Sequence, residues 1–147
     1  MYFLNFVEYQ KATYTVKTND LEVSGYQSLR RTTLWKQLPD HLVKQALSND
    51  LFSVSVYKGD ILIGMGRVIG DDSIYYYVQD VVVHTKYRGK GVGNLIMHNI
   101  EQYLKGEVET YAFIGLMAAK DSKGFYQKFG YRERDNESPG MYKVFSE

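Results

Sequence analysis

Residues 78–104 read VQDVVVHTKYRGKGVGNLIMHNIEQYL and join two regular segments through a corner that contains three glycines. The apolar residues before the corner belong to a run over 74–84 that predicts a strand covered on both faces. The apolar residues after it recur at helical spacing and predict a helix from Val92 to Lys105. A further apolar stretch at 109–119 predicts another strand. A strand, a helix and a strand in this order favour a parallel pair joined by a right-handed crossover.

The corner itself, from Arg88 to Gly93, combines glycines with two cations. A helix start presents unpaired backbone N–H groups and the positive end of the helix dipole. Glycines allow that backbone to approach a ligand closely because no Cβ intervenes, and Arg88 and Lys90 add positive charge. The corner therefore predicts a phosphate or pyrophosphate site. The alternative is a turn that only connects the strand to the helix.

The spacing of the glycines disfavours two common phosphate motifs. No Ser or Thr follows a Gly-Lys pair, as a P-loop requires, and the third glycine comes one residue too soon for a dinucleotide-binding fingerprint. An RNA-binding RRM domain also carries an Arg-Gly motif, but this corner lacks the stacking aromatic residues of that motif. A nucleotide-binding oxidoreductase and an RNA-binding domain are therefore the less favoured interpretations.

The rest of the chain predicts further strands and helices in one domain. From periodicity and turn residues we expect a strand at 14–18, helices at 26–38 and 39–49, three strands within 52–84, a short helix at 123–129 and an extended end at 141–145. The sum is an α/β or α+β domain with a mixed sheet and about four helices. Because no linker is visible, residues 1–147 are expected to form a single domain.

Composition limits the class of protein. The chain has 18 Lys and Arg against 17 Asp and Glu, so we expect neither nucleic-acid nor membrane-surface binding. It contains no cysteine, which excludes thiol catalysis and disulfides, and its three histidines have no metal-ligand spacing. The first ten residues do not resemble a signal peptide, and no apolar run approaches the ~20 residues that span a bilayer. We therefore expect a cytoplasmic protein without a metal.

Two motifs in the chain resemble landmarks of the GNAT superfamily of N-acetyltransferases. Arg88-Gly89-Lys90-Gly91-Val92-Gly93 is similar to the family's coenzyme A signature, Arg/Gln-x-x-Gly-x-Gly/Ala, and GFYQKFGYRER at 124–134 is similar to its tyrosine-bearing helix and the strand after it. The resemblance covers nearly the whole chain. It implies a mostly antiparallel central sheet with a splayed parallel strand pair, and acetyl transfer from acetyl-CoA to an amine. Homodimers are common in the family, so a homodimer is possible.

The resemblance also implies a binding site for acetyl-CoA. The backbone of Gly89, Lys90, Gly91, Val92 and Gly93 would hold the pyrophosphate, with Arg88 beside it. The backbone of Val81, Val82 and Val83 would pair with the pantetheine arm like an added strand, and an N–H there would polarise the thioester carbonyl. One departure concerns Ala119, where many family members have an Asn that contacts the pantetheine.

Two side chains are candidates for acid–base chemistry. Asp80 interrupts an apolar strand, where an unpaired charge would be costly, and matches a family position for the general base. The alternatives are an Asp that hydrogen-bonds the backbone at a bulge or that only attracts the amine, and His84 is a rival base. Tyr126 matches the family's general acid and lies on the same short helix as Phe125 and Phe129, which suit the core better. With no cysteine available, we expect direct attack by the amine.

The acceptor is poorly encoded in the sequence. By the family likeness it would lie against residues of the first helices, the central strand and the last segment: Tyr26, Arg30, Trp35, Tyr77 and Met141. The compact chain favours a small-molecule amine over a peptide. The alternative function is an acyl-CoA-binding sensor or an inactive relative that keeps the phosphate corner without the chemistry.

Overall fold

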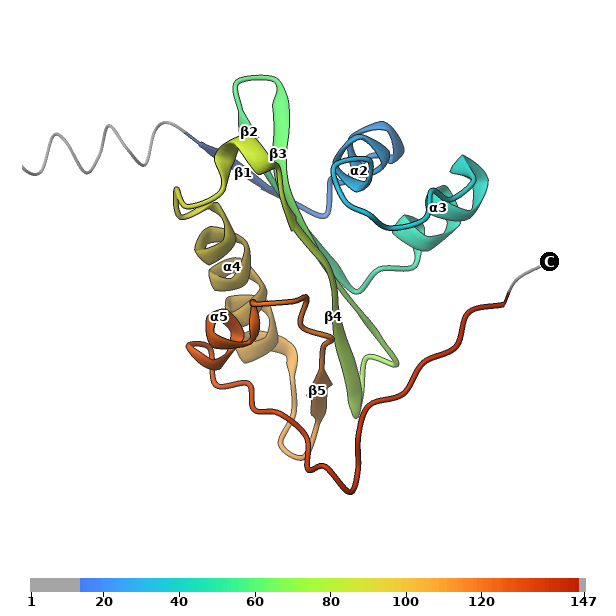
Figure 1. Ribbon diagram of the computed structural model, residues 1–147, viewed down its shortest axis with the longest axis vertical. Helices are drawn as coiled ribbons and strands as arrows, with labels where there is room; N and C mark the ends of the chain where they lie inside the picture. Colours follow the sequence, from blue (N-terminus) through green and yellow to red (C-terminus); the bar gives the residue numbers. More distant parts are fainter. Residues whose placement is uncertain (1–13, 146–147) are drawn as a thin grey trace, which may run out of the picture. The chain divides into compact units, whose positions relative to one another are not determined.

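The computed structural model describes residues 14–145, which divide into two compact units, one that ends at Met117 and one that begins at Ala118 (Figure 1). The first ten residues, for which a signal peptide was not expected, lie outside the described part. The elements are β1 (Thr15–Thr18), α2 (Val23–Arg30), α3 (Asp40–Ser48), β2 (Phe52–Lys58), β3 (Ile61–Gly70), β4 (Tyr75–Val83), a 3-10 turn (Thr85–Tyr87), α4 (Val92–Glu107), β5 (Phe113–Gly115) and α5 (Lys123–Gln127). The predicted mixed α/β architecture is confirmed.

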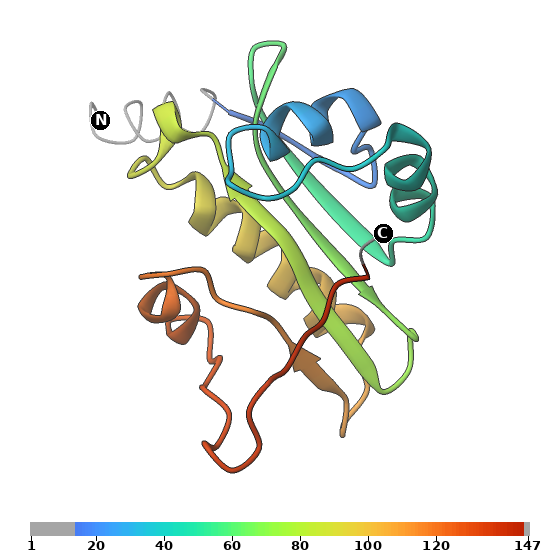
Figure 2. The same cartoon turned by 45° about the vertical axis from the view of Figure 1, so that its right-hand side comes forward.

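The sheet of the first unit has five strands in the order β1-β2-β3-β4-β5. Strands β1 to β4 are antiparallel, whereas β4 and β5 are parallel. This parallel pairing covers only Tyr75–Tyr77 of β4, opposite Phe113–Gly115, so the two strands are side by side at one end only (Figure 2). In the described residues the remainder of β4, 78–83, has no partner in β5.

Strand β5 is shorter than the strand predicted at 109–119. The N–H of Ala112 bonds to the carbonyl of Glu109, and Tyr111 adopts a positive φ of 82°, so the chain turns before it becomes extended. Beyond the strand, the N–H of Ser122 bonds to the carbonyl of Ala119, which forms the next turn. Turns on both sides therefore limit the extended region to three residues.

Helices cover both faces of the sheet in the first unit, with α2 and α3 on one face and α4 on the other (Figure 1). The α2 side is filled by a cluster of buried residues: Tyr26, Leu29, Val43, Met65 and Val82. On the α4 side, a Cβ at Gly66 would lie 2.7 Å from Ile96 and 2.9 Å from Ile100. The absence of a side chain at Gly66 therefore lets α4 lie directly on β3.

The helix predicted at 26–38 is wrong in its extent, since α2 begins at Val23 and ends at Arg30. The hydroxyl groups of Thr32 and Thr33 donate hydrogen bonds to the carbonyls of Leu29 and Arg30, which competes with helical continuation. The segment 31–39 is consequently a loop. Its far end is fixed by a 2.6 Å hydrogen bond from the Gln27 side chain to the carbonyl of Leu38.

The second unit contains α5 and an irregular tail. The helix is shorter than the predicted 123–129, because Gly130 adopts a φ of 90° and its N–H bonds to the carbonyl of Gln127. The extended end expected at 141–145 takes part in no strand pairing within residues 118–145. Four large apolar or aromatic side chains of this tail are exposed: Met141, Tyr142, Val144 and Phe145.

Candidate active site

Asp80 lies at a β-bulge in the middle of β4. Opposite β4, Met65 pairs with Val82 and Arg67 pairs with Gln79, so Asp80 and the next residue together face the single residue Gly66. Asp80 has a φ of +55°, a left-handed conformation that costs an L-residue about 1 kcal/mol. Only 4% of the residue is exposed. The bulge therefore turns a carboxylate into the α2 side of the sheet.

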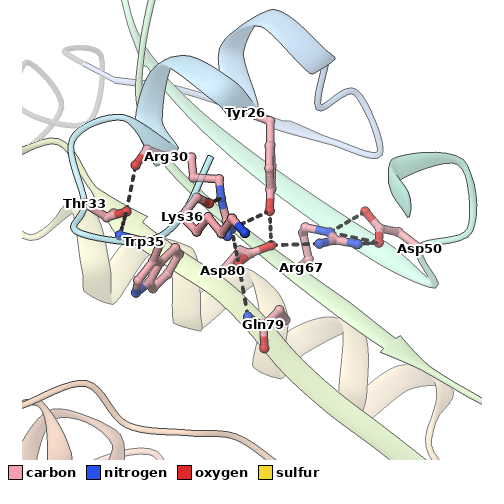
Figure 3. A network of polar contacts seen from close by, with 9 residues as sticks. All are labelled: Tyr26, Arg30, Thr33, Trp35, Lys36, Asp50, Arg67, Gln79 and Asp80. Carbon is pink, nitrogen blue, oxygen red and sulfur yellow. Dashed lines mark hydrogen bonds and ion pairs between the residues drawn. The ribbon is translucent and has the colours of Figure 1, made fainter. Parts of the chain in front are cut away.

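Three hydrogen bonds hold this carboxylate (Figure 3). The Tyr26 hydroxyl and Arg67 Nη1 each donate to Oδ2 at 2.7 Å, and Gln79 Nε2 donates to Oδ1 at 3.1 Å. Arg30 Nη1 forms a longer ion pair with Oδ1, at 3.9 Å. The charge of Asp80 is thus balanced by cations from α2 and β3, which avoids the cost of an unpaired charge in an apolar strand.

Arg67 is the cation nearest to Asp80, and it binds two carboxylates at once. Its Nε and Nη2 donate to Asp50 Oδ1 at 3.0 and 2.7 Å, while Nη1 reaches Asp80. Burial alone would lower the pKa of Arg67, but the hydrogen bonds that Arg67 donates to Asp50 and Asp80 outweigh it and raise that pKa. Burial raises the pKa of Asp50, against the effect of Arg67. Neither residue was identified from the sequence.

Tyr26 and Arg30 extend the same cluster, defined as Tyr26, Arg30, Asp50, Arg67 and Asp80. Burial, followed by the charge of Asp80 and its hydrogen bond, raises the pKa of Tyr26 to about 12. Arg30 Nη1 donates to the Tyr26 hydroxyl at 3.2 Å, and Arg30 Nε donates to the carbonyl of Lys36 at 2.8 Å. The Arg30 guanidinium lies 5.4 Å from the centre of the Trp35 ring.

Three of the residues predicted for the acceptor are therefore brought together. Tyr26 and Arg30 contact each other, and Trp35 stacks beside Arg30 from the loop after α2 (Figure 3). Tyr26 is 3% exposed and belongs to the core, whereas Trp35 is 39% exposed and is available at the surface. Tyr77 lies half-buried on β4, where it pairs with Ile69, and Met141 is exposed in the second unit.

The corner predicted to bind phosphate forms the start of α4. Gly91 is the N-cap with a φ of 83°, and Gly89 has a φ of 74°; a Cβ at either would meet no atom within 4 Å. The first helical hydrogen bond runs from the N–H of Leu95 to the carbonyl of Gly91, so the N–H groups of the first turn face outward. Arg88 and Lys90 are exposed, with Lys90 over the Tyr87 ring. This arrangement fits a diphosphate group.

The part of β4 between Asp80 and this corner pairs with β3 but not with β5. Val81 completes the bulge, and Val82 and Val83 follow it. Among residues 14–145, Val82 and Val83 pair with β3 on one edge and with no strand on the other. An extended ligand could pair with the opposite edge. His84 follows the last residue of β4, and its Nδ1 accepts a hydrogen bond from the N–H of Lys86, which stabilises the turn.

Tyr126 lies on α5 in the second unit, within a group of aromatic side chains. Its ring is 5.1 Å from Phe125 and 6.3 Å from Tyr131, both in edge-to-face contact. Burial raises the pKa of the Tyr126 hydroxyl. Tyr126 thus packs against aromatic neighbours of its own unit. Its hydroxyl remains protonated at neutral pH, as a proton donor must.

No helix in residues 14–145 is long and apolar enough to cross a membrane. Within the same range, no group of three His, Asp or Glu side chains is placed to hold a metal ion.

Comparison with known proteins identifies the family. A family model described as an acetyltransferase (GNAT) domain matches residues 9–140. A crystal structure of a protein of unknown function from meticillin-resistant Staphylococcus aureus, described as a probable acetyltransferase, has a TM-score of 0.84 at 32% identity and covers 90% of this chain and 99% of its own. A GNAT family protein from Streptococcus pneumoniae has a TM-score of 0.73 at 24% identity, with 91% and 99% covered. The protein named "Uncharacterized N-acetyltransferase ycf52" from Porphyra purpurea is 29% identical over 90% of this chain and 77% of its own length.

The chain therefore belongs to the GNAT acetyltransferase family, as the two sequence motifs predicted. The sequence had also named Asp80 and the glycine corner, whose roles stay predictions. It missed Arg67, Asp50 and Gln79, whose importance follows from contacts across strands. One signal was available for Arg67: a charged residue in the middle of the apolar run 61–69 needs a buried partner of opposite charge.

Proposed function

We propose that this protein transfers an acetyl group from acetyl-CoA to a primary amine of a small molecule, by direct attack and with acid–base assistance. The observation that carries the proposal is the arrangement along one strand. On β4, a buried carboxylate at a bulge is followed by an unpaired strand edge and then by a glycine corner at a helix start. Acetyl-CoA supplies an activated thioester when it is bound.

The donor side uses the backbone of the corner and of β4. The N–H groups from Gly89 to Gly93 bind the pyrophosphate, and Arg88 and Lys90 add charge around it. The edge of β4 at Val81–Val83 pairs with the extended pantetheine arm. An N–H in this segment donates a hydrogen bond to the thioester oxygen, where negative charge develops during attack.

The acid–base work falls to Asp80 and Tyr126. Oδ2 of Asp80 already accepts two short hydrogen bonds, so Oδ1 is the oxygen that receives the proton of the attacking amine. As the C–N bond forms and the C–S bond breaks, the Tyr126 hydroxyl gives its proton to the departing sulfur. His84 is the less favoured base because its Nδ1 is used within the turn.

The acceptor binds on the α2 side of β4. Because Asp80 is only 4% exposed, an amine that reaches it has to be carried on a narrow group, which favours a small molecule. Arg30 and Trp35 flank this approach from α2 and its loop. Tyr77 and Met141 remain proposed contacts of the acceptor.

The proposal is tested first by calorimetric titration of the protein with acetyl-CoA, NAD and ATP. Binding of acetyl-CoA alone is expected, and binding of NAD without acetyl-CoA contradicts the proposal. A panel of amines is then screened for release of free thiol. Turnover with one or more amines supports acetyl transfer, whereas coenzyme binding without turnover favours an acyl-CoA sensor.

A further inference from the structure

We infer that Arg67, held in place by Asp50, is a positioning residue that assigns different tasks to the two oxygens of Asp80. Oδ2 is the anchored oxygen, and Oδ1 is the oxygen presented to the acceptor amine. The inference rests on the proposed function, in which Asp80 accepts the proton of that amine. It adds two residues, Arg67 and Asp50, to which the sequence motifs gave no role.

The first step is the fixed orientation of Arg67. Its guanidinium forms a two-pronged contact with Asp50, through Nε and Nη2, in addition to its contact with Asp80. A guanidinium is planar, so fixing two of its nitrogens fixes the third. Only 9% of the Arg67 side chain and 6% of the Asp50 side chain are exposed, which leaves little room for either to reorient.

The second step is the unequal occupation of the Asp80 oxygens. Oδ2 accepts from Arg67 and from Tyr26, both at 2.7 Å, which uses the two lone pairs that an oxygen offers in the carboxylate plane. Oδ1 accepts one neutral hydrogen bond, from Gln79 at 3.1 Å, and its cationic neighbour Arg30 is 3.9 Å away. A lone pair of Oδ1 is therefore left for the N–H of an acceptor.

The third step is the electrostatic coupling within the cluster. The charged or titratable groups that face Asp80 are Tyr26 and Arg30 from α2 and Arg67 from β3, with Asp50 behind Arg67. Arg67 favours the charged form of Asp80, and Asp50 opposes it. Asp50 thus opposes the influence of the Arg67 charge on Asp80.

The inference is tested with three variants: Asp50→Asn, which removes the charge of Asp50 but keeps its shape, Arg67→Met, and Arg67→Lys. The Asp80 carboxyl group is titrated by carbon-13 NMR in the free protein, without any acceptor. In Arg67→Met the midpoint is expected to rise, because the variant removes an adjacent opposite charge. In Asp50→Asn the midpoint is expected to move to lower pH. The acidic limb of the pH profile of kcat/KM is expected to move to lower pH with it. Arg67→Lys is expected to keep the wild-type midpoint approximately and to lose turnover.

Asp71→Asn is the matched control. Asp71 Oδ1 accepts three backbone N–H groups in the turn between β3 and β4. Asn keeps an acceptor oxygen there but loses the negative charge, so the variant weakens these bonds without changing the Asp80 cluster. This variant is expected to unfold more easily while the midpoint of Asp80 stays unchanged. An unchanged or raised midpoint in Asp50→Asn overturns the inference, and this holds even where Arg67→Met does not fold.

The titration and the amine screen distinguish a failure of the proposed function from a failure of the inference on Arg67 and Asp50. If the wild-type protein acetylates no amine, the proposed function fails while the titration still decides whether Arg67 and Asp50 control Asp80. If the wild-type protein is active and Asp50→Asn alters neither the midpoint nor the acidic limb, the inference alone fails.

Discussion

The Tyr26 hydroxyl donates a 2.7 Å hydrogen bond to Oδ2 of Asp80, joining residues that lie 54 positions apart in the chain. The bond connects the first helix of the described residues to the bulge of the central strand. It also fixes the neutral form of the tyrosine, because an anionic hydroxyl could not donate to the carboxylate. This contact makes the stability of the protein depend on pH in the alkaline range.

Tyr26→Phe is expected to abolish part of that dependence. The pKa of Tyr26 is about 12 in the folded protein and 10 in the unfolded chain, so the unfolded chain binds fewer protons between these values. The contribution of Tyr26 to the free energy of unfolding is therefore fully present below pH 10 and is lost as the pH rises toward 12. The difference in unfolding free energy between wild type and variant should shrink by about 2 kcal/mol from pH 9 to pH 12. Urea unfolding across this range measures it, and a constant difference contradicts the assignment.

Asp80→Asn is expected to remove the acidic limb of the pH–rate profile, since the amide cannot accept the proton of the amine. The variant also weakens the hydrogen bonds from Tyr26 and Arg67, so a loss of about 2 kcal/mol in unfolding free energy is expected. Rates are measured by thiol release across the pH range. An acidic limb that survives in the variant points to His84 or to solvent as the base.

Tyr126→Phe is expected to lower turnover by about 10²-fold, the usual contribution of a general acid. Acetyl-CoA affinity, measured by calorimetry, should remain nearly unchanged, because only the hydroxyl is removed. Tyr142→Phe is the control, since Tyr142 is an exposed tyrosine of the same unit. Equal turnover in wild type and Tyr126→Phe removes Tyr126 from the mechanism.

Gly91→Ala tests the phosphate corner against a matched glycine. Gly91 and Gly59 both have a positive φ, and a Cβ at either meets no atom within 4 Å, so alanine costs each a similar ~1 kcal/mol of stability. Gly59 lies in the turn between β2 and β3, outside the corner. We expect Gly91→Ala to raise the dissociation constant of acetyl-CoA at least about tenfold, which corresponds to ~1.4 kcal/mol, and Gly59→Ala to leave it unchanged. Equal affinities in both variants exclude Gly91 from the binding site.

The parts of the structure predicted best from the sequence depend on local pattern. The run at 78–104 indicated a buried strand, a glycine corner and a helix, because apolar periodicity and glycine chemistry act over a few residues. The end of α2 was missed because the hydroxyl groups of Thr32 and Thr33 compete with the helix, although the apolar spacing continues to Leu38. Periodicity alone does not reveal this competition.

The sequence indicated single residues of the candidate site but not the contacts between them. Asp80 was conspicuous as a charge in an apolar strand, but its charged partners come from two other segments, α2 and β3. Arg67 lies 17 positions from Asp50 and 13 from Asp80, and these pairings follow from strand register rather than from sequence spacing. The bulge that inserts Asp80 opposite Gly66 likewise depends on how β3 and β4 align.

The sheet separates the two halves of the proposed site, and this has a consequence for modification of the protein. The cluster around Asp80 and the loop 31–39 belong to the face covered by α2, whereas α4, which carries the corner at its start, packs through Gly66 on the other face. Loop 31–39 can therefore be randomised to search for new acceptors while the contacts of α4 stay intact. Libraries directed at β3, in contrast, alter both faces at once, because its alternate residues serve each of them.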